Sequence, residues 1–228
     1  MSDNDEPATF SSPPCFMHEV DPTYGGLIVD QTQARDVARW RKAERERLIA
    51  TRLALSVSER DEAARRIARS LDGLTPNTPE TIVSLYWSFR GEPDLRFWMA
   101  ERCVMGGRVA LPVVIAKGQP LVFREWTPAA RLERGVWSIP FPVDGVIVTP
   151  TVVIAPLVGF DRAGYRLGYG GGFFDRTLAA ISPKPVVIGV GYAHGAISTI
   201  YPQWRDIPMD HVLIGDDGSP HAKPANHP

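Results

Sequence analysis

The sequence predicts a single-domain α/β fold of three layers, in which helices cover both faces of a mainly parallel sheet. Short β-rich runs alternate with helical segments after residue 80, which is typical of strands joined by helical crossovers. Residues 146–158 form an apolar run that predicts a buried strand. A glycine-rich loop and then a helix follow that run, so the loop is expected at the edge of the sheet where such folds bind ligands.

The N-terminal segment, residues 1–31, is predicted to be an extended leader because its composition is rich in Pro, Ser and Asp. It contains Cys15, His18 and Glu19, which are residue types that ligate metals. These three donors have no partner cluster in the sequence. We therefore interpret the leader as an irregular arm rather than a metal site.

Two helices are expected next. The first spans residues 32–55, and its apolar face is formed by Val37, Leu48 and Leu55. Ser56 and Glu59 have the spacing of a capping box, which predicts the start of the second helix. The apolar stripe of that helix is formed by Ala64, Ile67 and Leu71.

The remaining elements follow in order along the chain. Strands are predicted over 81–87, 108–115, 121–126, 146–158 and 185–192, with 212–214 as an edge strand. Helices are predicted over 94–105 and from residue 173 to 180. The domain is expected to span residues 32–215, and residues 216–228 are expected to form a flexible tail.

The composition favours a soluble enzyme. The chain has 228 residues and a net charge of −1, which argues against nucleic acid or membrane partners. Its two cysteines are too few for a disulfide scaffold, and the acidic N-terminus lacks the basic region of a secretory signal. No apolar stretch has the length of a transmembrane helix. We expect a cytoplasmic monomer, with a weak dimer as the alternative.

The glycine loop, residues 168–172, predicts an anion site. Glycine lets the backbone lie against a polyphosphate, and the free N–H groups at the start of the following helix favour negative charge. Arg166 precedes the loop, and Asp161 and Asp175 bracket it. Cationic groups and a carboxylate for Mg²⁺ are what ATP requires. The common phosphate fingerprints are absent, since no Gly-Lys-Ser/Thr ending occurs and Phe173 replaces the last glycine of a dinucleotide motif.

Several separated motifs around the glycine loop and elsewhere occur in a specific order along the chain. The most specific are Pro-Leu-Val-Gly-Phe-Asp at 156–161 and Gly-Tyr-Arg-Leu-Gly-Tyr-Gly-Gly-Gly-Phe-Phe-Asp-Arg at 164–176. The others are Tyr-Trp-Ser-Phe-Arg-Gly-Glu-Pro-Asp at 86–94, Gly-Arg-Val-Ala-Leu-Pro at 107–112, Trp-Ser-Ile-Pro-Phe-Pro at 137–142, Gly-Val-Gly-Tyr at 189–192 and Trp-Arg-Asp-Ile-Pro at 204–208. Together these motifs resemble those of the 5-formyltetrahydrofolate cyclo-ligase family, also called methenyltetrahydrofolate synthetases. The resemblance covers about residues 38–215 and implies a Rossmann-like α/β/α arrangement.

The activity that this resemblance implies is closure of 5-formyltetrahydrofolate to 5,10-methenyltetrahydrofolate, driven by ATP. A formamide is a poor electrophile with a poor leaving group. Transfer of the γ-phosphate to the formyl oxygen creates a good leaving group, and N10 of the same folate then attacks the carbon. The protein mainly has to position the reactants and neutralise charge.

The resemblance also implies roles for individual residues. Arg41 and Arg45, one helical turn apart, match the basic pair that contacts ATP phosphates. Arg166 and Tyr169 are the expected catalytic residues. The residues expected to wrap the triphosphate are Arg166, Leu167, Gly168, Tyr169, Gly170, Gly171, Gly172, Phe173 and Phe174. Mg²⁺ is expected on Asp175 and Asp206, and the folate on Glu92, Trp87 and Trp137.

Several of these assignments have a structural alternative. Arg41 and Arg45 could form a solvated basic face, Glu92 could be an exposed loop acid, Asp175 a first-turn helix acid and Asp206 an ordinary turn residue. Two positions depart from the family pattern, since Arg41 stands where Lys is common and Phe174 where Tyr is usual. Two further functions therefore stay open: a paralogue acting on another pterin or one-carbon substrate, and a folate- or nucleotide-binding protein without turnover.

Overall fold

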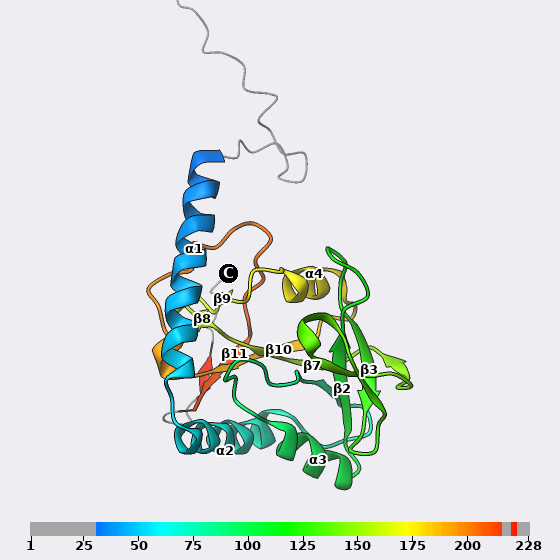
Figure 1. The fold of residues 1–228 in the computed structure, drawn as a ribbon. Coiled ribbons are helices and arrows are strands. Elements are labelled where there is room, and N and C mark those ends of the chain that lie inside the picture. Colours follow the sequence, from blue (N-terminus) through cyan, green and yellow to red (C-terminus); the bar gives the residue numbers. More distant parts are fainter. Residues whose placement is uncertain (1–30, 216–219, 223–228) are drawn as a thin grey trace, which may run out of the picture. The chain divides into compact units, whose positions relative to one another are not determined.

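The computed structural model describes residues 31–215 and 220–222 (Figure 1). The chain divides into two compact units, Met1–Ala38 and Arg39–Pro228. The second unit contains every strand of the structure.

The predicted leader and tail fall mostly outside the described residues. Helix α1 begins at Gln31, the last residue of the predicted leader. The candidate donors Cys15, His18 and Glu19 lie outside the described part of the chain. Within the predicted tail, Pro220–Ala222 forms a strand, β12.

Four α-helices and two 3-10 turns are described. They are α1 (Gln31–Leu53), α2 (Val57–Leu74), α3 (Arg96–Val104), η3 (Val136–Ser138), α4 (Phe173–Ala180) and η4 (Ala193–Gly195). The strands are β1 (Ile82–Ser84), β2 (Arg108–Val113), β3 (Val122–Trp126), β4 (Leu132–Arg134), β5 (Pro140–Pro142), β6 (Ile147–Val148), β7 (Val152–Pro156), β8 (Gly159–Phe160), β9 (Arg166–Leu167), β10 (Val186–Gly191), β11 (His211–Ile214) and β12. No helix within the described ranges is long and apolar enough to cross a membrane.

The main sheet has eight strands in the order β12-β11-β10-β7-β1-β2-β3-β6. Its central strands, from β11 to β2, are parallel, whereas β12, β3 and β6 pair antiparallel with their neighbours. The predicted α/β fold with a mainly parallel sheet is thus confirmed. The prediction of 212–214 as an edge strand is wrong, because β12 pairs with β11 on its outer side.

Side chains of alternating residues divide the core between the two faces of the sheet. Val83 belongs to a cluster with residues of α2 and α3, such as Ile67 and Met99. Its neighbour Ile82 belongs to a second cluster that includes Leu178 of α4. Figure 1 shows α2 and α3 on one side of the sheet and α4 on the other, which confirms the three layers.

The apolar run 146–158 is not one buried strand, as was predicted, but two. Its first part is β6 at the edge of the sheet, where Ile147 is 65% exposed, and its second part is β7 in the centre. Pro150 lies between them and has no N–H to offer a neighbouring strand. The Thr151 N–H then donates to the Ile82 carbonyl at 2.9 Å, and the chain enters the sheet beside β1.

The predicted capping box is confirmed at the start of α2. The Glu59 N–H donates to Ser56 Oγ at 3.2 Å, and the Ser56 N–H donates to Glu59 Oε2 at 2.7 Å. Ala64, Ile67 and Leu71 are buried, as their spacing predicts.

Candidate active site

The glycine loop follows the carboxyl end of the central strand β7. The chain leaves β7, forms the β8–β9 hairpin, passes through the loop and enters α4 (Figure 1). Helix α1 packs against this hairpin, since Leu48 and Ile49 share a buried cluster with Val158 and Leu167. The helix that carries the basic pair is therefore fixed beside the loop.

The backbone of the glycine loop is open at Gly168, whereas a Cβ added to Gly171 would lie 2.9 Å from the Phe173 ring and one added to Gly172 would lie 2.8 Å from Arg176 Nη1. Gly170 has φ +90° and Gly172, the N-cap of α4, has φ +62°, a region that side chains rarely permit. A Cβ added to Gly168 would meet nothing within 4 Å, whereas one added to Gly170 would lie 3.4 Å from the Arg45 guanidinium. An anion could therefore approach the bare backbone at Gly168 with Arg45 at its side.

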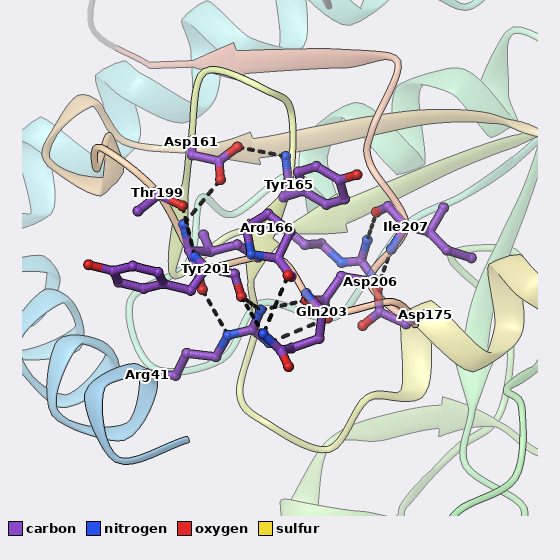
Figure 2. Close-up of polar contacts among 12 residues, drawn as sticks. Arg41, Asp161, Tyr165, Arg166, Asp175, Thr199, Tyr201, Gln203, Asp206 and Ile207 are labelled. Atoms are coloured by element: carbon purple, nitrogen blue, oxygen red, sulfur yellow. Dashed lines mark hydrogen bonds and ion pairs between the residues drawn. The ribbon is translucent and has the colours of Figure 1, made fainter. Parts of the chain in front are cut away.

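Arg41 and Arg45 of α1 are hydrogen-bonded to segments beside the glycine loop, so the two do not form a solvated basic face. Arg45 Nε donates to the Gly168 carbonyl at 2.6 Å. Arg41 donates to the Ile200 carbonyl at 2.9 Å and to both carboxylate oxygens of Asp206 (Figure 2). Burial, followed by the charge of Arg41, lowers the pKa of Arg45. Two neighbouring cations favour a polyanion between them.

The carboxylates predicted to bind Mg²⁺ gather around one buried arginine. Asp175 accepts hydrogen bonds from Arg166 Nη2 at 2.8 Å and from the Ile207 N–H at 3.2 Å (Figure 2). Burial lowers the pKa of Arg166, while the charges of Asp175 and Asp206 oppose that shift. The Arg166 side chain is only 4% exposed, so it supports the site and does not reach out as a free cation.

The donor set fits magnesium bound together with phosphates. Within the described residues, no three His, Cys, Asp or Glu side chains gather into a metal cluster. Mg²⁺ is commonly held by one or two carboxylates, with waters and substrate phosphates completing its shell. Asp175 and Asp206 would supply those carboxylates, after release from their arginine partners.

Asp161 has a different role. One of its oxygens accepts from the N–H groups of Ala163 and Tyr165, each at 3.1 Å, and the other accepts from the Ile200 N–H at 3.1 Å (Figure 2). These three bonds fix the β8–β9 turn to the segment at residue 200. Both oxygens of its carboxylate are therefore engaged by backbone N–H groups.

Glu92 is buried, so the alternative of an exposed loop acid is wrong. Only 5% of the residue is exposed, and its Oε2 accepts a hydrogen bond from the Phe89 N–H at 2.8 Å. Burial raises its pKa from 4.5 to about 7, although the Arg52 charge and the Tyr169 hydroxyl lower it. Such a carboxyl can accept N–H groups from a pterin edge in a dry environment.

The glycine loop and the Glu92 segment meet at Tyr169. Its ring lies 6.0 Å from that of Phe89 and 6.5 Å from that of Trp137. Its hydroxyl accepts a hydrogen bond from Arg52, a residue that sequence reasoning did not single out because α1 contains many arginines. Burial and the nearby Glu92 raise the pKa of Tyr169, so the phenol stays protonated.

The aromatic residues expected at the folate pocket are not equally close to it. Trp137 is 52% exposed and lies beside Tyr169 and Phe173. Trp87 packs against the core beneath α3, with the Arg96 guanidinium 5.3 Å from its ring centre, and its described contacts do not include the glycine loop. The Leu167 side chain is buried in the cluster with Leu48 and Val158.

Comparison with known proteins then identifies the family. The model of the "5-formyltetrahydrofolate cyclo-ligase family" matches residues 37–215. The chain belongs to this family.

Relatives of known name agree with this assignment. The chain is 33% identical over 174 residues to the 5-formyltetrahydrofolate cyclo-ligase of Escherichia coli K12, covering 71% of this chain and 93% of the relative. It is 27% identical to that of Haemophilus influenzae, covering 71% and 90%. The 5,10-methenyltetrahydrofolate synthetase of Aquifex aeolicus has a similar structure, with a TM-score of 0.69 and 26% identity over 82% of this chain and 95% of that one.

Membership in the cyclo-ligase family implies ATP use. The departure at Phe174 has a place in the structure. The Arg166 guanidinium lies 5.7 Å from the centre of that ring, and the ring also packs against the core. Both contacts are made by the aromatic ring, so they do not require the hydroxyl that a tyrosine would add.

Proposed function

We propose that this protein catalyses the ATP- and Mg²⁺-dependent closure of 5-formyltetrahydrofolate to 5,10-methenyltetrahydrofolate, with release of ADP and phosphate. The observation that carries the proposal is the meeting of the open glycine loop with the buried Glu92 segment at Tyr169. A nucleotide at the loop and a pterin at Glu92 would then be neighbours, in a chain of the cyclo-ligase family.

The nucleotide end of the reaction depends on the basic pair and the loop. Arg45 Nε is held by the Gly168 carbonyl, which leaves its terminal nitrogens to face a phosphate. The loop N–H groups and the start of α4 would stabilise negative charge that builds up on the transferred phosphoryl group. Asp175 and Asp206 would hold Mg²⁺, which would supply positive charge to offset that of the phosphates.

The folate end depends on Glu92 and the aromatic residues around Tyr169. An ionised Glu92 would accept pterin N–H groups and fix the orientation of the ring. Trp137 presents an exposed ring face that suits a flat heterocycle. Positioning of N10 beside the activated formyl carbon would supply most of the protein's contribution to cyclisation.

The test is a turnover assay. Purified protein with Mg-ATP and 5-formyltetrahydrofolate is expected to generate the absorbance of the methenyl product. If ATP raises the melting temperature but the folate does not, and no product forms, the paralogue acting on another substrate is supported instead. If both ligands raise the melting temperature without turnover, the protein is a binding module.

A substitution separates magnesium binding from folding. Asp175→Asn removes a charged ligand but keeps an oxygen that can accept the Ile207 N–H, so we expect kcat to fall at least ~100-fold. Loss of the charged partner of Arg166 is expected to cost only about 1–3 kcal/mol of stability. The control is Asp144→Asn, an exposed acid paired with Arg131, which should leave kcat unchanged. Parallel loss of kcat and folded protein in Asp175→Asn would show that the acid is structural.

A further inference from the structure

Arg52 joins three segments that the chain brings together from distant positions. Its side chain is among the largest that are fully buried, with 2% of the residue exposed. Nε donates to the Arg90 carbonyl at 2.9 Å, and Nη1 donates to the Leu157 carbonyl at 3.1 Å. Nη2 donates to the Tyr169 hydroxyl. One guanidinium thus holds the turn before Glu92, the end of β7 and the glycine loop.

The turn that Arg52 holds has an unfavourable backbone. Arg90 has φ +48° and Gly91 has φ +75°, and a non-glycine residue in this region persists only where neighbours fix it. The Tyr192 hydroxyl donates to the Gly91 carbonyl at 2.9 Å, beside the bond from Arg52 to Arg90. These two contacts fix the backbone that carries the Glu92 carboxyl.

The environment of Glu92 also needs a cation. The charged and titratable groups that act on its carboxyl are Arg52 from α1, Tyr169 from the glycine loop and Tyr86 from its own segment. Both phenols are buried and have raised pKa values, with burial as the main cause. Arg52 is therefore the group that offsets the negative charge when Glu92 ionises.

We propose that Arg52 is a positioning residue that sets the Glu92 carboxyl and the glycine loop together, so that the folate and nucleotide sites depend on one side chain. A guanidinium suits this role because its planar fork of donors reaches several acceptors while its charge is permanent. The proposal rests on the cyclo-ligase function proposed above, but its first test does not need turnover.

The first test measures Glu92 in the protein without substrates. Arg52→Met removes the positive charge and keeps a long, unbranched side chain. Arg52→Lys keeps the positive charge and loses the planar set of guanidinium donors. We expect the midpoint of the Glu92 carboxyl titration, followed by carbon NMR, to rise by about one pH unit or more in Arg52→Met. It should stay close to the original value in Arg52→Lys. An unchanged midpoint in Arg52→Met would overturn the electrostatic part of the proposal, whatever the protein catalyses.

The second test measures both substrates. Arg52→Lys is expected to raise the KM for ATP and the KM for the folate together, each by about tenfold, the equivalent of one lost hydrogen bond to a charged group. Tyr169→Phe removes only the hydroxyl that accepts the hydrogen bond from Arg52, and it should raise both KM values as well. If an Arg52 variant fails to fold, this variant still tests whether both sites depend on the contact between Arg52 and Tyr169. The control is Arg47→Met, an exposed arginine on the same helix that pairs with Glu44.

The outcomes are distinct. A rise of only one KM in Arg52→Lys and in Tyr169→Phe would overturn the shared dependence. A purely structural Arg52 would lower the melting temperature and leave both KM values and the Glu92 titration unchanged. If the wild-type protein has no cyclo-ligase activity, the proposed function fails, and the NMR titration still decides whether Arg52 controls Glu92.

Discussion

At the scale of single residues, the arginines divide into those that support the site and those that face a ligand. Arg166 and Arg52 are buried, and their guanidinium groups are bonded to carbonyls, a carboxylate and a phenol. Arg45 is bonded only through Nε within the described residues, so it remains the proposed phosphate contact. From the sequence, Arg166 is expected to be catalytic and to bind the triphosphate, and Arg45 is expected to contact phosphates because it matches the basic pair of the family.

Glu92 makes a testable link between pH and stability. Its pKa in the folded protein is about 7, above the ordinary 4.5, so between these values the folded state keeps a proton that the unfolded state loses. The stability due to this proton is full below pH 4.5 and is lost as pH rises to 7. The loss amounts to about 3 kcal/mol at 1.36 kcal/mol per pKa unit.

Glu92→Gln should remove this dependence. Denaturant unfolding at a series of pH values is expected to show the variant gaining about 3 kcal/mol relative to wild type between pH 4.5 and 7. Glu133→Gln, an exposed acid, is the matched control and should run parallel to wild type. Parallel curves for Glu92→Gln as well would mean that Glu92 is not kept protonated by burial.

At the scale of elements, two glycine-to-alanine substitutions test whether the glycine loop binds the nucleotide. Gly168→Ala places its Cβ in open space, so we expect stability within about 0.5 kcal/mol of wild type. The same methyl would occupy the side of the loop where a phosphate is proposed, and the KM for ATP should rise about tenfold or more. Gly170→Ala forces φ +90° on a side chain and should cost about 1–3 kcal/mol of stability. An unchanged KM in Gly168→Ala would place the nucleotide elsewhere.

The start of α2 offers an element whose stability is separate from the site. Ser56→Ala removes the acceptor for the Glu59 N–H, and we expect a loss of about 1 kcal/mol in the free energy of unfolding with kcat unchanged. Ser58→Ala, on the same exposed turn, is the control. A fall in kcat in folded Ser56→Ala would indicate that α2 affects the site.

At the scale of the whole molecule, local sequence patterns predict the helices and most strands. They do not predict the contacts between residues that are far apart in the sequence. The Ser56–Glu59 spacing and the apolar stripe of α2 depend on neighbours in sequence, so they are readable directly. The pairing of β12 depends on which strand lies alongside, which composition does not encode. Pro150, by contrast, is a local signal for the division of 146–158, and the prediction of one strand did not use it.

The candidate site shows the same limit. The glycine loop is visible as a motif, and the family resemblance orders the other residues around it. Arg52 is invisible because its partners are the carbonyls of Arg90 and Leu157 and the hydroxyl of Tyr169. Every residue has a backbone carbonyl, so the sequence does not show which carbonyls accept hydrogen bonds from an arginine. A buried arginine in an arginine-rich helix therefore cannot be told from exposed ones by sequence alone.

The loop and α4 belong to one excursion of the chain, residues 157–185, that leaves the sheet after β7 and returns as β10, its direct neighbour. Because both ends are anchored in a fixed scaffold, each doubling of this stretch adds only about 0.6 kcal/mol of closure entropy. Evolution could thus lengthen, shorten or exchange residues 157–185 while the central strands of the sheet stay unchanged. New chemistry could arise here without a new architecture.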